Sequence, residues 1–214
     1  MRGLHFVRYA DDCNIFVRSD VAAERVMKSV TSWLERKLFL KVSATKTKIV
    51  RPTNSNFLGF TFWKNSDVWQ CRPGNDRKTK LYDKIRKVLK RKHAISKTLA
   101  ITFTKLNQII RGWINYFRIG NMKAFISEFG QWLRHKVRVI IIKQWKIPKR
   151  IYINLQRLNK AFKCNFEDEE IYKVANSRFG WYRRSGKDVV NYILSPKVLA
   201  LANKKKGRPG LVNC

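Results

Sequence analysis

Two adjacent acids, Asp11 and Asp12, are the residues of this sequence whose types and spacing most directly indicate chemistry. Neighbouring carboxylates repel each other, and in a cleft each raises the pKa of the other unless a cation neutralises them. A divalent metal with oxygen ligands would do so, and Mg²⁺ is the usual ion where phosphates are also bound. Aspartate is also a common turn residue, so a polar hairpin turn is the alternative. The pair taken alone favours the turn.

Strand-forming residues lie on both sides of the pair, with Phe6, Val7 and Tyr9 before it and Ile15, Phe16 and Val17 after it. They predict a β-hairpin with both acids at its turn. A helix is expected next, with Ser19-Asp20 at its N-cap. Its apolar residues recur at helical spacing and predict one inward face: Ala22, Val26, Val30, Trp33, Leu34 and Leu38.

Short apolar runs at 40–42, 46–50, 57–63 and 68–71 are expected to form further strands. Residues 1–75 are therefore predicted to be one α+β layer, with strands on one side and a helix covering them. The pattern changes near Pro73-Gly74 and is helical from there on. Helices are expected at 77–92, 105–117 and 122–145, with Pro148 after the last one. Three helices with apolar faces predict a small bundle over residues 76–150.

The net charge points to a polyanionic partner. The 214 residues carry 47 Lys and Arg against 14 Asp and Glu, a formal charge of +33, and residues 76–150 alone hold 21 bases and three acids. Such a charge is self-repulsive unless a polyanion relieves it, and nucleic acid does so through counterion release. Solvated helix faces usually mix charge signs. The bases at 77–92, which include Arg86, Lys87, Lys90 and Arg91, are therefore predicted to contact phosphates.

The last third, residues 151–214, is predicted to be a small extension with a basic tail at 204–210. The acids from Glu167 to Glu170 are compatible with a metal site, but they favour a helix N-terminus, where they meet the helix dipole. The run from Asn176 to Arg184 interleaves aromatic residues with arginines, including Arg183 and Arg184. This composition suits RNA stacking and phosphate contact.

Cysteine and histidine usage limits the compartment and the metal chemistry. Cys13, Cys71, Cys164 and Cys214 are far apart with no C-x-x-C pair, and three histidines are scattered. The sequence therefore lacks the usual zinc signature and predicts a reducing, cytoplasmic setting. No apolar run approaches the ~20 residues of a membrane helix, and the first residues lack the apolar core of a signal peptide. No membrane association is expected.

Four strings in order resemble the C-terminal half of a bacterial group II intron-encoded reverse transcriptase/maturase. Residues 6–12, FVRYADD, resemble the palm hairpin of reverse transcriptases, and residues 40–49, LKVSATKTKI, the Lys-Thr motif that follows it. Residues 57–60, FLGF, resemble the strand turn that grips the primer. Residues 111–117, RGWINYF, are the most specific string and resemble the maturase-specific thumb, or domain X, as does the run 143–146, KQWK.

The resemblance implies an α+β fold: a partial palm (1–75) of hairpin, helix and short antiparallel strands, a basic three-helix thumb (76–150) and a maturase extension (151–214). It implies the nucleotidyltransferase chemistry of an RNA-directed DNA polymerase and a role in RNA splicing, both as parts of a mobile element. The implied partners are intron RNA and a nucleic-acid template with its primer. Asp11 and Asp12 would be catalytic ligands of Mg²⁺. The roles that follow for other residues are palm and template support by Tyr9, Ala10, Lys46 and Thr47, primer grip by Leu58 and Gly59, and RNA binding by Arg86, Lys87, Lys90, Arg91, Arg111, Arg134, Arg183 and Arg184.

The family's site also needs a third carboxylate and fingers upstream of the YADD hairpin, and only eight residues precede Tyr9 here. We therefore expect this chain alone to be inactive as a polymerase. Its first expected function is intron RNA binding in splicing. The alternatives are one piece of a split reverse transcriptase, completed by an N-terminal fragment, and a basic RNA-binding structural protein. A membrane-surface protein is the weakest alternative. The sequence does not indicate an oligomeric state.

Overall fold

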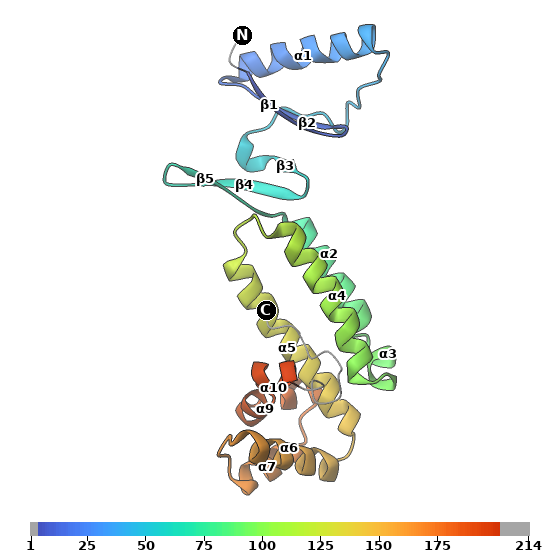
Figure 1. Ribbon diagram of the computed structural model, residues 1–214, viewed down its shortest axis with the longest axis vertical. Coiled ribbons are helices and arrows are strands. Elements are labelled where there is room, and N and C mark those ends of the chain that lie inside the picture. Colours follow the sequence, from blue (N-terminus) through green and yellow to red (C-terminus); the bar gives the residue numbers. More distant parts are fainter. Residues whose placement is uncertain (1–3, 202–214) are drawn as a thin grey trace. The chain divides into compact units, whose positions relative to one another are not determined.

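The computed structural model describes residues 4–201, without the side chains of residues 91–93, and divides the chain into two compact units, Met1–Gly74 and Asn75–Cys214. The first combines small antiparallel sheets with one long helix, and the described elements of the second are all helices (Figure 1). The predicted α+β class is confirmed. The predicted boundary at 150 stays a prediction, and Met1 and the basic tail at 204–210 lie outside the described residues.

The first unit begins with the predicted hairpin. Strand β1 (His5–Tyr9) pairs antiparallel with β2 (Asp12–Phe16), and Tyr9 is opposite Asp12. Helix α1 (Asp20–Lys37) follows, and the Ser19 side chain accepts a hydrogen bond of 3.3 Å from the Ala22 N–H as its N-cap. This satisfies one of the four N–H groups that a helix N-terminus leaves without a partner.

The middle of the first unit differs from the prediction. The runs 40–42 and 46–50 are not strands. Residues 44–46 form a turn in which Ser43 O accepts the N–H groups of Lys46 and Thr47 at 3.2 and 3.0 Å. These short runs have strand composition, but in the described residues no neighbouring strand pairs with them, and a strand is stable only when its backbone groups are paired.

The second sheet of this unit has three antiparallel strands in sequence order. Strands β3 (Asn56–Phe57), β4 (Phe60–Asn65) and β5 (Val68–Pro73) follow the short 3₁₀ helix η1 (Pro52–Asn54). They cover the predicted runs 57–63 and 68–71, interrupted by a turn at Leu58-Gly59. The backbone N–H of Gly74 donates to the Gly59 carbonyl at 2.8 Å, which ties the end of the unit to this turn.

Apolar packing in the first unit is sparse. Phe60 is the one hydrophobic side chain that is buried among its described residues, and no residue of α1 is buried. Two residues of the predicted inward face of α1 are exposed, Trp33 by 55% and Leu38 by 48%, so their assignment to a core is wrong. A two-stranded hairpin is too narrow to cover an 18-residue helix, and only Ala22, Val26, Val30 and Leu34 of that face are half-buried.

The second unit contains nine described helices: α2 (Asn75–Val88), α3 (Arg91–Ser96), α4 (Leu99–Phe117), α5 (Lys123–Trp145), α6 (Pro148–Phe162), α7 (Asp168–Ala175), α8 (Trp181–Ser185), α9 (Asp188–Ile193) and α10 (Pro196–Leu201). The predicted helices at 77–92, 105–117 and 122–145 correspond to α2, α4 and α5. Pro148 does not close α5, which ends at Trp145; it begins α6, where proline is favoured at the first position.

Helices α2, α4 and α5 share the main core of this unit, with α2 and α4 side by side (Figure 1). The apolar faces predicted for these helices are inside, since Leu106 and Ile110 on α4 and Leu133 and Val137 on α5 are buried. Tyr82 on α2 adds edge-to-face contacts to Phe129 and Trp132 at 5.4 and 4.7 Å between ring centroids. Tyr82, Phe129 and Trp132 are therefore packing residues of the bundle.

The helices after α5 pack into the same core. Ile151 and Leu155 of α6, Ile171 of α7 and Ile193 of α9 belong to the same buried cluster as the bundle. The acids from Glu167 to Glu170 form a helix N-terminus, as predicted. Glu167 and Glu170 make a capping box at the start of α7.

Candidate functional site

The β1–β2 hairpin presents the two acids side by side at an exposed end. Asp11 lies in the two-residue turn and Asp12 is the first residue of β2, and both are exposed. Ala10 has a φ of 52°, which only a few per cent of non-glycine residues adopt. The Arg8 Nε donates to the Ala10 carbonyl at 2.8 Å, which helps to hold this turn conformation.

The donor set of the turn fits a divalent oxygen-preferring cation in part. Asp11 and Asp12 supply carboxylate oxygens, the ligands that Mg²⁺ favours. Within the described residues no group of three or more His, Cys, Asp or Glu side chains gathers here or elsewhere. Two protein carboxylates are enough for Mg²⁺ when water or a phosphate fills its other positions. The hairpin therefore presents two exposed carboxylates of the kind that Mg²⁺ prefers.

The predicted primer-grip residues form a tight turn. Leu58 and Gly59 connect β3 and β4, with φ values of 53° and 83°, and Phe57 pairs with Phe60 across them. Two successive positive φ values are typical of the type I′ turn, which suits the twist of a two-residue hairpin. Glycine adopts this conformation without strain, whereas leucine does not. Strained backbone of this kind clusters at functional sites.

The predicted palm-support residues lie in two separate turns of the first unit. Tyr9 is the last residue of β1, directly before Ala10, and its side chain is 65% exposed. Lys46 and Thr47 are exposed in the turn after α1, where the Ser43 and Thr45 hydroxyls lie 3.1 Å apart.

The predicted RNA-binding residues of the second unit divide by exposure. Lys87, Lys90, Arg111 and Arg183 are exposed, and Arg134 is half-buried. Arg86 is exposed but engaged: its Nη1 lies 3.0 Å from Asp83 Oδ1, and its guanidinium lies over the Tyr82 and Trp132 rings at 5.7 and 5.9 Å. The side chain of Arg91 lies outside the described residues.

Arg184 does not have the surface position that RNA contact requires. It is 8% exposed, donates to the Ser177 carbonyl and lies over the Trp181 ring at 5.2 Å. Burial lowers the pKa of this guanidinium. Its neighbour Arg183 stays exposed over the Phe179 ring at 5.0 Å. The prediction that Arg184 binds RNA is therefore corrected, because its side chain holds the 177–184 segment together.

Two segments of the chain match models of known protein families. Residues 1–62 match the model of reverse transcriptase (RNA-dependent DNA polymerase), and residues 78–159 match that of the group II intron maturase-specific domain. The chain belongs to the group II intron reverse transcriptase/maturases. The acidic hairpin and the Leu58-Gly59 turn lie in the reverse transcriptase segment. The maturase-specific segment runs from α2 into α6 and includes Arg86, Arg111 and Arg134.

No curated protein matches the chain. In the part of the chain that the structure describes, no helix is both long and apolar enough to cross a membrane.

One residue of the maturase-specific segment, Arg138 on α5, was not singled out from the sequence. It is 7% exposed, and its Nε donates to the Leu194 carbonyl at 3.0 Å. Its Nη1 donates to Asn191 Oδ1 at 2.8 Å and its Nη2 to the Asn191 carbonyl at 3.2 Å. Burial, with Arg134 nearby, lowers the pKa of Arg138 to about 10. The sequence signal that could have identified Arg138 as buried is the apolar run 139–142 directly after it, because a helix that is apolar on all sides is buried.

His135, on the same turn of α5, is held by packing. Its ring meets Tyr182 edge to face at 4.2 Å, and a Cβ at Gly186 would lie 3.3 Å from its Cε1, so the glycine allows this approach. Its Nε2 is buried without a hydrogen-bond partner in the described residues. Burial, together with the positive charges of Arg138 and Lys136, lowers the pKa of His135.

The lowered pKa of His135 predicts a loss of stability in acid. Because the unfolded chain takes up this proton first, near its ordinary pKa of about 6.5, the free energy of unfolding should fall as the pH drops below that value. Urea unfolding at pH 7.5, 6.0 and 5.0 measures the fall. His135→Phe keeps a flat ring against Tyr182 and should have a shallower pH dependence. Equal slopes for both proteins would contradict the assignment.

Proposed function

We propose that this chain binds structured group II intron RNA through its maturase-specific unit and assists splicing of that RNA. Family membership supports the choice of RNA, and the distribution of charge on α2 supports the place of binding. A charge of +33 on one chain needs a polyanion nearby, and phosphate contacts supply most of the affinity in such complexes.

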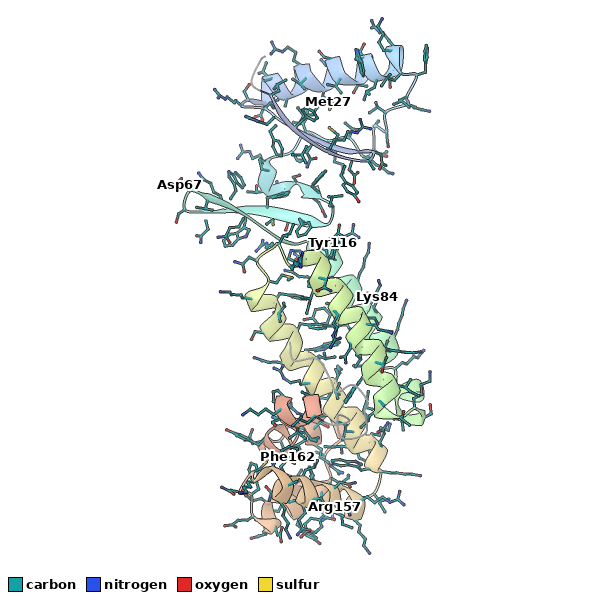
Figure 2. The ribbon with its side chains drawn as sticks, in the orientation of Figure 1. Met27, Asp67, Lys84, Tyr116, Arg157 and Phe162 are labelled. Carbon is teal, nitrogen blue, oxygen red and sulfur yellow. The ribbon has the colours of Figure 1, made fainter. Side chains whose placement is uncertain are left out.

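The observation that carries this proposal is the basic face of α2. Lys80, Lys84 and Lys87 are exposed at helical spacing, and Lys90 follows the end of the helix. None of these four lysines forms an ion pair with a residue of the described chain. Figure 2 shows Lys84 extending away from the bundle. These ammonium groups are therefore available to phosphates.

RNA binding is tested by the salt dependence of affinity. A transcript of a structured group II intron domain is titrated with the protein between 50 and 400 mM KCl and followed by fluorescence anisotropy. We expect log K to fall linearly with log salt concentration, with a slope of about −0.7 to −0.9 for each phosphate contacted. A slope near zero would contradict the proposal. Splicing assistance is tested by the splicing rate of the transcript with and without protein, and an unchanged rate would contradict that part.

The exposed acids of the hairpin support a second candidate function, one part of a split RNA-directed DNA polymerase. In this proposal Asp11 and Asp12 hold Mg²⁺, which when bound activates the attacking 3′-oxygen and stabilises the charge on the leaving pyrophosphate. The Leu58-Gly59 turn would position the primer. The residues that would support the palm or the template and primer are Tyr9, Ala10, Lys46 and Thr47. An N-terminal reverse-transcriptase fragment would be the partner.

Primer extension separates the two functions. In the described residues no third acidic, His or Cys side chain gathers with Asp11 and Asp12. Because the members of a catalytic site act as a unit, we expect the purified chain to extend no primer on an RNA template with Mg²⁺. Extension that Asp11→Asn and Asp12→Asn both abolish would contradict this expectation. Extension that appears only after addition of a separate reverse-transcriptase N-terminal fragment would support the split enzyme.

A further inference from the structure

Helix α8 and its flanking residues carry aromatic and basic side chains but no acid. Residues 176–187 contain three aromatic residues, three arginines and one lysine. Two of these side chains point inward, because Arg184 is buried and Trp181 packs against the core. The aromatic and basic residues that stay exposed are Arg178, Phe179, Tyr182, Arg183 and Lys187. This segment therefore presents rings and positive charges together.

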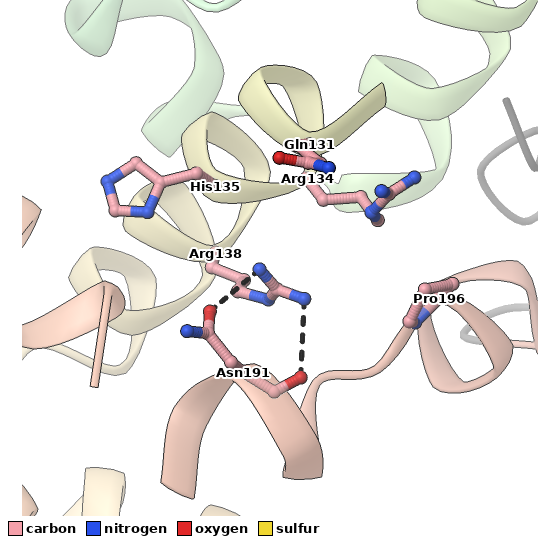
Figure 3. Close-up of a pocket in the computed structure, with 6 residues that line it drawn as sticks. All are labelled: Gln131, Arg134, His135, Arg138, Asn191 and Pro196. Carbon is pink, nitrogen blue, oxygen red and sulfur yellow. Dashed lines mark hydrogen bonds between the residues drawn. The ribbon is translucent and has the colours of Figure 1, made fainter. Parts of the chain in front are cut away.

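The backbone of this segment is held at both ends. Arg138 on α5 donates to the side chain and the carbonyl of Asn191 on α9 at 2.8 and 3.2 Å (Figure 3). The Asn191 Nδ2 in turn donates to the carbonyl of Gly186, directly after α8, at 3.1 Å. Before α8, the carbonyl of Ser177 accepts a hydrogen bond from the buried Arg184. Side chains on backbone that is fixed in advance lose less entropy when a ligand binds.

Two rings of the segment are open to solvent. Phe179 is 46% exposed and Tyr182 is 58% exposed. The Tyr182 ring is held in one orientation by the His135 ring of α5, which meets it edge to face at 4.2 Å between centroids. Each exposed ring therefore offers a flat apolar surface on which another ring can stack.

Positive side chains lie over both rings. Arg183 Cζ and Lys187 Nζ are 5.0 and 5.3 Å from the centre of the Phe179 ring. Lys136 Nζ, from the neighbouring α5, is 4.9 Å from the centre of the Tyr182 ring. These are cation–π distances. None of the three bases forms an ion pair with a described residue, so their charges are available to an anion beside the rings.

Unpaired nucleotides fit this combination of rings and charges better than an RNA duplex or an acidic peptide does. A nucleotide joins a flat base to a phosphate, and unpaired bases of RNA stack on aromatic rings and on arginine planes. In a duplex the bases stack on one another, so the protein meets mainly the backbone and the minor groove. An acidic peptide would use the positive charges and leave the rings uncovered.

We propose that Phe179 and Tyr182 stack on unpaired bases of the intron RNA. Arg183, Lys187 and Lys136 contact the phosphates of the same nucleotides. This role rests on the RNA binding proposed above and adds the class of RNA that the segment around α8 recognises. The lysines of α2 can contact the phosphates of any RNA. The segment around α8 would therefore direct the protein to loops and single-stranded joints of the folded intron.

The first test compares single-stranded with paired RNA. A fluorescein-labelled strand of twelve uridines and an RNA duplex of twelve base pairs are each titrated with the full chain at 0.1 M KCl. Phe179→Ala should weaken binding of the single strand by about five- to a hundredfold, the usual effect of one lost stacking contact, and leave duplex binding unchanged. Phe179→Trp keeps a ring and should bind as wild type does. Equal losses on both RNAs, or an unchanged single-strand affinity, would overturn the proposal.

A matched tyrosine controls for exposure alone. Tyr172 on α7 is 58% exposed, as Tyr182 is, and its ring also meets another ring edge to face, that of Tyr152 at 6.1 Å. The first turn of α7, however, carries three acids. Tyr182→Ala should therefore weaken single-strand binding about tenfold, whereas Tyr172→Ala should leave it unchanged. Equal losses for the two variants would count against a specific surface around α8.

Polyglutamate tests the alternative occupant, an acidic protein segment. It carries negative charges like those of a single strand but no bases. Labelled polyglutamate should therefore bind more weakly than the uridine strand, and Phe179→Ala should not change its affinity. Polyglutamate binding that is as tight as that of the strand, and is weakened by Phe179→Ala, would overturn the proposal in favour of an acidic protein partner.

The salt dependence of transcript binding separates this proposal from the function on which it rests. Stacking releases no counterions, so Phe179→Ala should lower the affinity for the intron transcript without changing the slope of log K against log salt concentration. Arg183→Gln should reduce that slope by about one. If wild type binds with a steep slope but neither variant differs from it, the stacking proposal fails alone. If wild type shows no salt-dependent binding, the function proposed above fails as well.

Discussion

Replacing Phe103 with alanine is expected to lower the free energy of unfolding of the second unit by about 3–5 kcal/mol, the usual cost of deleting a buried aromatic ring. Phe103 is 0% exposed on α4 and belongs to the cluster that also contains Leu106, Leu133 and Leu155. The lost ring would leave a cavity among helices that meet there. Urea unfolding followed by circular dichroism at 222 nm measures the change.

Tyr116→Ala is the matched control for this experiment. Tyr116 is an aromatic residue of the same helix but is 55% exposed, and Figure 2 shows it at the end of α4. Because its ring is half exposed and contacts Phe117 at 4.7 Å, the expected cost of Tyr116→Ala is smaller, about 1 kcal/mol. A loss for Phe103→Ala no larger than that of Tyr116→Ala would show that α4 is not a core helix. Unchanged RNA affinity of Tyr116→Ala would separate stability from binding.

The core of the second unit could be predicted from the sequence because helical periodicity reports burial directly. The apolar stripes at 105–117 and 122–145 each continue over several turns, and their members, such as Ile110 and Leu133, are buried. The capping box at Glu167 and Glu170 was also foreseeable, since it needs only two residues three apart. Local patterns of this kind need no information about distant parts of the chain.

The first unit was harder to predict because a pattern indicates which face is apolar, not whether anything covers that face. Trp33 and Leu38 follow the stripe of α1 and are exposed, so the described residues leave that part of the apolar face uncovered. The runs 40–42 and 46–50 have strand composition but lack a paired neighbour in the described chain. Strand formation depends on non-local pairing, which composition does not reveal.

The sequence also does not show which positive charges of the second unit are exposed. The sequence gives Lys87, Arg138 and Arg184 equal weight as bases, yet the first is exposed and the other two are buried with backbone acceptors. Burial of an arginine requires acceptors that satisfy its donors. For Arg138 these come from Asn191 and Leu194, more than fifty residues away. Net charge therefore predicts a polyanionic partner, whereas only the fold identifies which bases are exposed to contact it.

Neutralising the basic face of α2 is expected to produce the largest loss of RNA affinity. The quadruple variant Lys80→Gln, Lys84→Gln, Lys87→Gln and Lys90→Gln removes exposed ammonium groups that lack ion pairs in the described residues. At 0.1 M salt each phosphate contact contributes about eightfold, so four contribute on the order of 10³. The salt slope should fall by about four. Stability should not fall, because fewer like charges repel one another.

Two controls make this result specific. The same four lysines changed to arginine keep the charge and should keep the affinity within a few fold. Changing four exposed bases of α6 to glutamine, namely Lys149, Arg150, Arg157 and Lys160, removes the same charge from another element and should cost much less. Equal losses for the α2 and α6 variants would mean that the RNA responds to total charge alone. A thousandfold loss confined to the α2 variant, with an unchanged urea midpoint, would identify α2 as the face that meets the RNA.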